Sequence, residues 1–339
     1  MSILDLFVFL PVIVLLAMSR TLDNKSIFSR ESTATLRGIA MIWIIINHIQ
    51  GQSAFGGSPL LTYIGYWATG LFFFISGYGN TLSMNKKNAG EVSVRWLLKK
   101  IKKIYIPYFV GYWLCFIIKL FFSPDSIPTI KKVIIELIIL DLPDMTIWFT
   151  KIILLCFLLH WISQKVFSRI AQKYVFYSLL IFLCLYIILV IKLNAGSEWY
   201  SSVICYAIGL FAAINKEILS LSEGRGKKYI YLIVFSVLFI ITFLAKGYIC
   251  YSQILHTALF SIMCFAYTAL FKIKTCFLAF IGNNSFEFFV LHFVCLKSFY
   301  SLISINKYLY VFAVMAGSII IVLIYVNIKK LIKGRYYVN

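Results

Sequence analysis

Arg37 and His48 are residues whose types and spacing suit chemistry inside a membrane. They lie in an apolar stretch, TLRGIAMIWIIINHI, that runs from Thr35 to Ile49. Eleven positions at about 100° each make three helical turns plus roughly 20°, so both side chains share one stripe, roughly 16 Å apart along the axis. Ionisable side chains within a membrane span are costly and indicate a functional site. The competing interpretation makes Arg37 a snorkelling interfacial anchor and His48 a cap at the far end of the helix.

The composition indicates that the elements positioning these residues are membrane helices. Hydrophobic residues make up 62% of the 339 positions and charged residues only 13%, against about 25% charged in soluble domains. The mean hydropathy is +0.92. We predict an all-α, polytopic transmembrane helical bundle of about eleven spans. Their expected ranges are 3–19, 35–50, 62–83, 104–122, 146–163, 174–192, 199–215, 228–246, 249–271, 283–304 and 308–328.

The distribution of basic residues predicts the orientation in the membrane. The formal net charge is +20. With the N-terminus outside, 24 of the 32 Lys and Arg residues fall in inner segments, five in outer segments and three within spans. This bias follows the positive-inside rule. We therefore expect a multi-pass protein of the plasma membrane with a cytoplasmic C-terminus, and anionic lipid instead of nucleic acid as the partner of the basic charge.

Motifs of several other function classes are missing from the sequence. The eight cysteines form no CxxC pair and no Cys/His ligand spacing, so we expect neither a metal site nor a disulfide framework. There is no Walker loop, dinucleotide fingerprint or Ser-nucleophile elbow. His160 and His256 have no motif around them, and we interpret them as packing or interfacial side chains.

Further segments accompany the Arg37/His48 helix in a fixed order. They are GLFFFISGYGN from Gly70, RWLLKKIKKIYIPYF from Arg95, the pair Trp148-Phe149, and IGNNSFEFFVLHF from Ile281. This ordered set resembles the acyltransferase-3 family of integral-membrane O-acyltransferases over about residues 33–330. The chain departs from the family pattern at Lys100 and Lys103, which replace an RxxR-like pair, and at Phe289, where the family often has tyrosine.

The resemblance implies an O-acyltransferase, most simply an O-acetyltransferase without a metal. It would move an acyl group from cytoplasmic acyl-CoA, with acetyl-CoA as donor, to a hydroxyl of a cell-surface polysaccharide or its lipid-linked precursor. Residues 1–32 would form an additional N-terminal transmembrane helix and cytoplasmic loop, and residues 33–339 a membrane-only acyltransferase domain. The site residues implied are His48 and Arg37 for catalysis, Arg37, Lys100, Lys103, Ser76 and Tyr78 for the donor, and Trp148, Ser285, Glu287 and His292 for the acceptor.

The chemistry of these residues agrees with acyl transfer to a hydroxyl. A mostly neutral imidazole at His48 suits a general base or a transiently acylated nucleophile, and the sequence leaves both open. The distance to Arg37 suits a long donor whose phosphates lie at the inner side. We expect Ser285 and His292, seven positions apart, to face a cavity together. Residues 76–78 either distort the third span or allow it to pack closely against another helix.

An alternative function is a transporter or flippase of a glycan or lipid-linked amphiphile, with the same polar residues along its path. Broken half-helices at repeated positions would favour it, and the sequence does not predict them.

Overall fold

The computed structural model describes residues 12–13, 16–17, 19–21, 28–52, 59–85, 92–122, 128–143, 145, 147–215, 225–248 and 251–335. The first elements are β1 (Arg20–Thr21), α2 (Arg30–Gly51), α3 (Pro59–Asn85), α4 (Val94–Phe122), α5 (Ile130–Ile139), α6 (Trp148–Phe167), α7 (Gln172–Lys192), the 3₁₀ turn η2 (Ser197–Trp199) and α8 (Ile204–Ile214). They are followed by α10 (Arg225–Leu244), the 3₁₀ turn η3 (Ala245–Gly247), α11 (Ser252–Leu270), β2 (Phe271–Lys272), α12 (Cys276–Asn283), α13 (Ser285–Ser298), α14 (Leu302–Ile305) and α15 (Lys307–Arg335).

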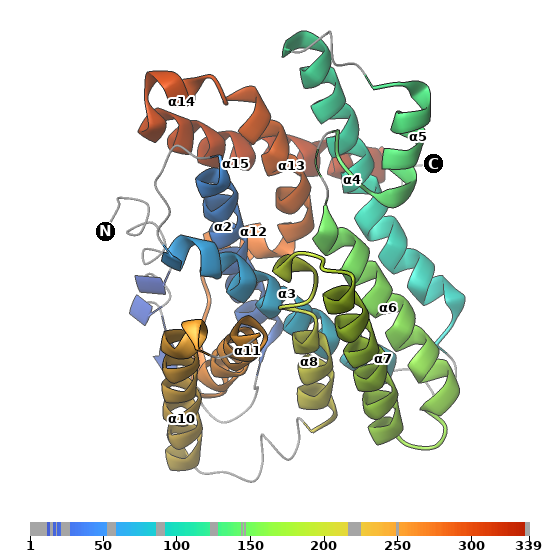
Figure 1. Ribbon diagram of the computed structural model, residues 1–339, viewed down its shortest axis with the longest axis vertical. Helices are drawn as coiled ribbons and strands as arrows, with labels where there is room; N and C mark the ends of the chain where they lie inside the picture. Colours follow the sequence, from blue (N-terminus) through green and yellow to red (C-terminus); the bar gives the residue numbers. More distant parts are fainter. Residues whose placement is uncertain are drawn as a thin grey trace.

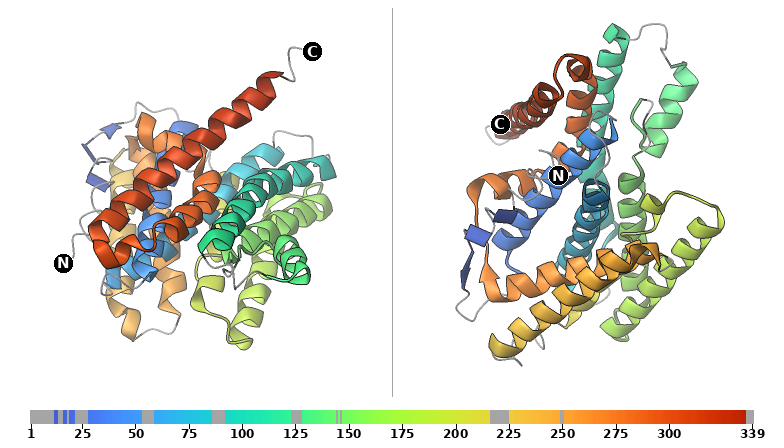
Figure 2. Two further views of the ribbon diagram at one scale, coloured as in Figure 1. Left: turned by 90° about the horizontal axis from the view of Figure 1, so that it is seen from above. Right: turned by 60° about the vertical axis from the view of Figure 1, so that its left-hand side comes forward.

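The helices form one bundle around α2 and α3. In Figure 1, α4 to α7 lie on one side of this centre, α10 and α11 on the other, and α13 to α15 above it. Helix α2 packs against α3, α12 and α13, and α3 packs against α8 and α11. The short strands β1 and β2 pair antiparallel. Figure 2 shows α15 extending past the rest of the bundle towards the C-terminus.

The predicted all-α membrane bundle is confirmed. Nine described helices are long and apolar enough to cross a membrane, and α12 with α13 forms a bent pair that counts as a tenth span. These ten elements correspond to the ten spans predicted from residue 35 onward. The predicted first span, 3–19, lies mostly outside the described residues, as does most of the N-terminal segment 1–32.

The predicted span 283–304 is wrong in its shape. Helices α12 and α13 meet at Asn284 with a bend of 84°. Thr275 caps the start of α12 by accepting a hydrogen bond from the Leu278 amide at 3.2 Å. At its end, the Phe280 carbonyl oxygen accepts two hydrogen bonds from Asn284, one from the backbone amide at 3.2 Å and one from the side-chain amide at 2.9 Å. The Gly-Asn-Asn run from Gly282 therefore ends one helix and starts another.

Of the two alternatives for residues 76–78, the distortion is wrong, because α3 is continuous from Pro59 to Asn85. Gly77 instead permits close helix packing. A Cβ atom there would collide with the Tyr206 carbonyl oxygen of α8, and one at Gly209 of α8 would collide with the Phe74 carbonyl oxygen of α3. Small residues at helix contacts are the usual means of close approach in membranes. This contact holds α3 in a fixed position beside the cavity described next.

Candidate active site

A cavity of about 840 Å³ lies between α2, α3, α4, α6 and the α12–α13 bend. One part of its wall is cationic, with Arg30 and Arg37 from α2 and Lys100 and Lys103 from α4. Polar side chains of α3 and of the bend adjoin them, namely Ser76, Tyr78, Asn80, Ser83, Asn283 and Ser285. The remaining wall is apolar and aromatic, with Phe72, Phe149, Ile153, Phe157, Phe286 and Phe289 among its residues.

The four cations face a cavity that has no Asp or Glu among its described lining residues. The Arg37 Nε donates to the Thr33 carbonyl oxygen at 3.4 Å, a bond within its own helix. The Lys100 ammonium lies over the rings of Trp96 and Phe157, at 5.2 and 5.8 Å from their centroids. Like charges gathered around a partly apolar cavity repel one another unless an anion lies between them, so this end of the cavity suits phosphate groups.

Glu287, which follows the cavity residue Phe286 in the sequence, has its carboxylate paired with a lysine. Glu287 is buried, with 3% of its surface exposed, and its Oε1 accepts a hydrogen bond from the Lys329 ammonium at 2.9 Å. Glu287 does not line the cavity. The structure therefore places this proposed acceptor residue in an ion pair that joins α13 to α15.

His48 and His292 lie together outside the cavity lining. Their ring centroids are 5.2 Å apart, and the ring of Phe293 lies 4.9 Å from that of His48. His48 is half-buried, whereas His292 is fully buried. The expectation that Ser285 and His292 face the cavity together is correct for Ser285 and wrong for His292. His292 packs instead against the rings of His48 and Phe293.

Phe289 contacts both regions. It lines the cavity, where its ring centroid lies 5.1 Å from that of Phe149, and the same ring lies 6.2 Å from the His292 ring. Trp148 begins α6 and contacts Phe149 at 6.1 Å, without lining the cavity itself. Phe289 thus contacts both the cavity, where it packs against Phe149, and the ring of His292.

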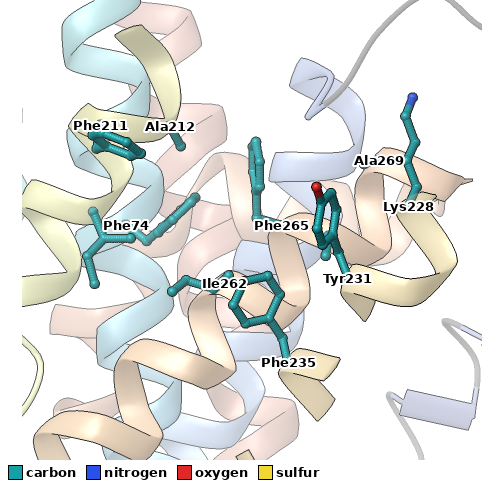
Figure 3. A pocket seen from close by; sticks show the side chains of 11 residues that line it. Phe74, Phe211, Ala212, Lys228, Tyr231, Phe235, Ile262, Phe265 and Ala269 are labelled. Atoms are coloured by element: carbon teal, nitrogen blue, oxygen red, sulfur yellow. The ribbon is translucent and has the colours of Figure 1, made fainter. Parts of the chain in front are cut away.

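A second pocket, of about 230 Å³, lies between α8, α10 and α11 (Figure 3). Its lining is almost entirely apolar, with Phe211, Phe235 and Phe265 as the largest side chains. The polar ends of Lys228 and Tyr231 point to one side of it in Figure 3. Reactive sites combine an apolar pocket with a few convergent polar groups. The larger cavity has such groups, so we take it and the adjoining histidines as the candidate active site.

Six of the site residues predicted from the sequence line the cavity. Three are the cations Arg37, Lys100 and Lys103, and three are the polar residues Ser76, Tyr78 and Ser285. Arg30 and Asn80 were missed. The signal for Arg30 was present, because it precedes Arg37 by seven positions and so lies on the same helix face. Asn80 lies four positions after Ser76, on the same face of α3.

The other two histidines are packing side chains, as expected. His160 is fully buried, and its Nδ1 lies 3.0 Å from the Tyr206 hydroxyl. His256 is fully buried, and its Nδ1 accepts a hydrogen bond from the Trp67 indole at 3.1 Å. Within the described residues, no group of three or more His, Cys, Asp or Glu side chains is arranged to hold a metal ion.

These observations define a multi-pass helical membrane protein with a cation-lined internal cavity and a pair of adjoining histidines. The sequence profile of the acyltransferase-3 family, described as an acyltransferase domain, matches residues 34–327. The chain therefore belongs to this family and is a membrane acyltransferase. No curated protein and no solved structure matches it.

Proposed function

We propose that the protein is an O-acetyltransferase that uses cytoplasmic acetyl-CoA to acetylate a hydroxyl of a cell-surface polysaccharide or its lipid-linked precursor. The observation that carries the proposal is the cavity in which four cations face an aromatic wall, with no Asp or Glu among its described lining residues. A CoA thioester matches this wall, because it has phosphates at one end and a slender arm with an acyl group at the other.

The cations would hold the phosphates of the donor. Arg37 presents a planar guanidinium that suits a phosphate geometrically, whereas Lys100 and Lys103 act as point charges. Arg30 adds a fourth charge on the same face of α2. Ser76 and Tyr78 line the cavity next to them and offer hydroxyl groups to the donor.

The reaction would take place at the histidines. Arg37 and His48 are on one helix, α2, at a rise of roughly 16 Å, so they cannot act on the same carbonyl group. The extended arm of the donor would span this distance and bring the thioester past Phe149 and Phe289. His48 would then act as the base towards the acceptor hydroxyl or carry the acyl group transiently. Trp148 and Ser285 lie at the aromatic wall and at the bend, where they would contact donor or acceptor.

The orientation supports a cytoplasmic donor. We propose that the N-terminus is outside and the C-terminus cytoplasmic, in the plasma membrane, because most basic residues then lie inside. All four cavity cations lie in the N-terminal halves of α2 and α4, which in this topology are the halves towards the inner side. The acyl group would be taken up from the cytoplasm.

The test is direct binding of a non-hydrolysable acetyl-CoA analogue to the purified protein, followed by transfer from radiolabelled acetyl-CoA to envelope material. We expect saturable binding that weakens with salt, and transfer of label to polysaccharide. Absence of CoA binding would contradict the proposal and favour the transporter alternative. Binding without transfer would contradict the enzymatic activity alone.

A further inference from the structure

The hydrogen bond at His292 determines which of its ring nitrogens carries the proton. The Nδ1 atom lies 3.0 Å from the Phe288 carbonyl oxygen. A carbonyl oxygen only accepts, so Nδ1 must be the donor, and in a neutral imidazole the other nitrogen, Nε2, then has an open lone pair. Nε2 is buried and has no hydrogen-bond partner in the part of the chain that the structure describes. His292 is therefore held with a proton acceptor free in a buried position.

His256 shows the opposite arrangement and serves as an internal comparison. Its Nδ1 accepts from the Trp67 indole, which can only donate. The proton of a neutral His256 must therefore be on Nε2, so this ring has no free acceptor. Both side chains are fully buried and both have an Nε2 without a partner among the described residues. The two rings therefore differ at Nε2, which has a free lone pair in His292 and carries the proton in His256.

The open acceptor of His292 lies where the reaction is proposed to occur. The His292 ring is 5.2 Å from the His48 ring and 6.2 Å from the ring of Phe289, which lines the donor cavity. The ring of Phe293 lies 4.1 Å from that of His292 and 4.9 Å from that of His48, so the two imidazoles belong to one cluster of rings. A thioester that reached this cluster past Phe289 would meet His292 and His48 together.

We propose that Nε2 of His292 is the base that takes the proton of the acceptor hydroxyl, an inference that rests on the proposed acyltransferase function. The acceptor oxygen forms a bond to the carbonyl carbon of the acyl group while its proton passes to Nε2. When the tetrahedral adduct collapses, its bond to the leaving group breaks. With the thioester as the acyl source, the leaving thiolate of CoA takes the proton from His292, so charge and atoms balance.

This assignment narrows the role of His48. The bond to Phe288 orients His292, as the third group of a nucleophile–base arrangement orients the base. His48 has no such bond among the described residues and is half-buried. Its role is then to carry the acyl group or to donate a hydrogen bond to the developing oxyanion. If His48 carries the acyl group, its ring nitrogen is the leaving group in the second step and takes the proton from His292.

The test uses two variants that separate the two ring nitrogens. In His292→Asn the amide nitrogen occupies the place of Nδ1 and keeps the bond to Phe288, while the group at Nε2 is lost. In His292→Gln an amide without basicity occupies the place of Nε2. The matched control is His256→Asn, which keeps an acceptor for Trp67 and likewise loses Nε2. All are measured in the full-length purified protein with radiolabelled acetyl-CoA and envelope vesicles from cells that lack the protein.

We expect both His292 variants to lose 10²–10⁴-fold in kcat, with unchanged binding of the non-hydrolysable acetyl-CoA analogue. The control should keep kcat near the parent value. Nitrogen NMR of the parent should show the Nδ1-protonated tautomer at His292. Near-parental kcat in either folded His292 variant, or the Nε2-protonated tautomer, would overturn the base assignment.

Transfer by the parent tests the proposed function, and transfer by the His292 variants tests the role of His292 as the base. A parent protein that binds the analogue but transfers no acetyl group contradicts the proposed function and the base role with it. An active parent with an active His292→Asn contradicts the base role only. Should His292→Asn fail to fold, His292→Gln carries the same test.

Discussion

Arg37 and His48 lie on one helix, yet only Arg37 lines the cavity, and His48 lies instead beside His292. The stripe predicted from their spacing therefore connects two different environments. One is a cationic cavity of about 840 Å³, and the other is aromatic and holds two imidazoles. Phe289 contacts both, because it lines the cavity and its ring lies 6.2 Å from the His292 ring.

We expect Arg37→Ala to weaken binding of the acetyl-CoA analogue by about tenfold or more, because it removes a charge-assisted phosphate contact. Lys100→Gln and Lys103→Gln should each weaken analogue binding less than Arg37→Ala does, and their effect should be smaller at high salt. Isothermal titration calorimetry at two salt concentrations measures these affinities and their dependence on salt. Lys330→Gln, on the exposed end of α15, is the control. Equal affinity of Arg37→Ala and the parent would remove the cavity cations from donor binding.

Phe289 should limit the size of the acyl group. We expect Phe289→Leu to shift the ratio of kcat/KM for butanoyl-CoA over acetyl-CoA upward by about tenfold, since pocket methylenes discriminate on this scale. Phe157→Leu, at the Lys100 end of the same cavity, should leave the ratio unchanged. An unaltered ratio in Phe289→Leu would show that this ring does not contact the acyl group.

The Glu287–Lys329 pair should support the fold and not the acceptor. Lys329→Met leaves a buried carboxylate without its cation, so we expect a clear fall in Tm. Glu287→Gln should lower Tm less, because the amide can still accept a hydrogen bond from Lys329. Thermal unfolding in detergent compares the two. A Glu287→Gln variant with full stability and a selectively raised KM for the acceptor would instead support the role predicted from the resemblance.

Reporter fusions after Asn339 and within residues 84–103 should both report a cytoplasmic location. The reason is the excess of Lys and Arg in the segments assigned to the inner side. Fusions at residues 123–129 should report the opposite side. An external signal from either of the first two positions would reverse the topology and place the cavity cations away from cytoplasmic CoA.

Hydropathy predicted the ten spans from residue 35 onward in their order, because each apolar run must satisfy its own backbone polar groups as a helix. It missed the 84° bend at Asn284, because an apolar window does not distinguish one long helix from two short ones joined at an angle. It also missed α5, a helix of ten residues that is too short to span.

The site was predictable where residues share a helix face, as Arg37 and Arg30 do, or follow a motif, as Lys100 and Lys103 do. The pairing of His48 with His292 was not, since it depends on how α2 and α13 pack. The same holds for the contact of Phe289 with Phe149 in the cavity, which depends on how α13 lies against α6. Such contacts between distant segments have no local sequence pattern.

Donor binding and acyl transfer are proposed to occur at separate places in this one protein. The most direct measurement compares the parent with His48→Ala, using analogue binding and acetyl transfer on the same purified sample. We expect His48→Ala to bind the analogue with parental affinity and to lose at least 10²-fold in transfer. Near-parental transfer by His48→Ala, or loss of binding together with transfer, would contradict the account.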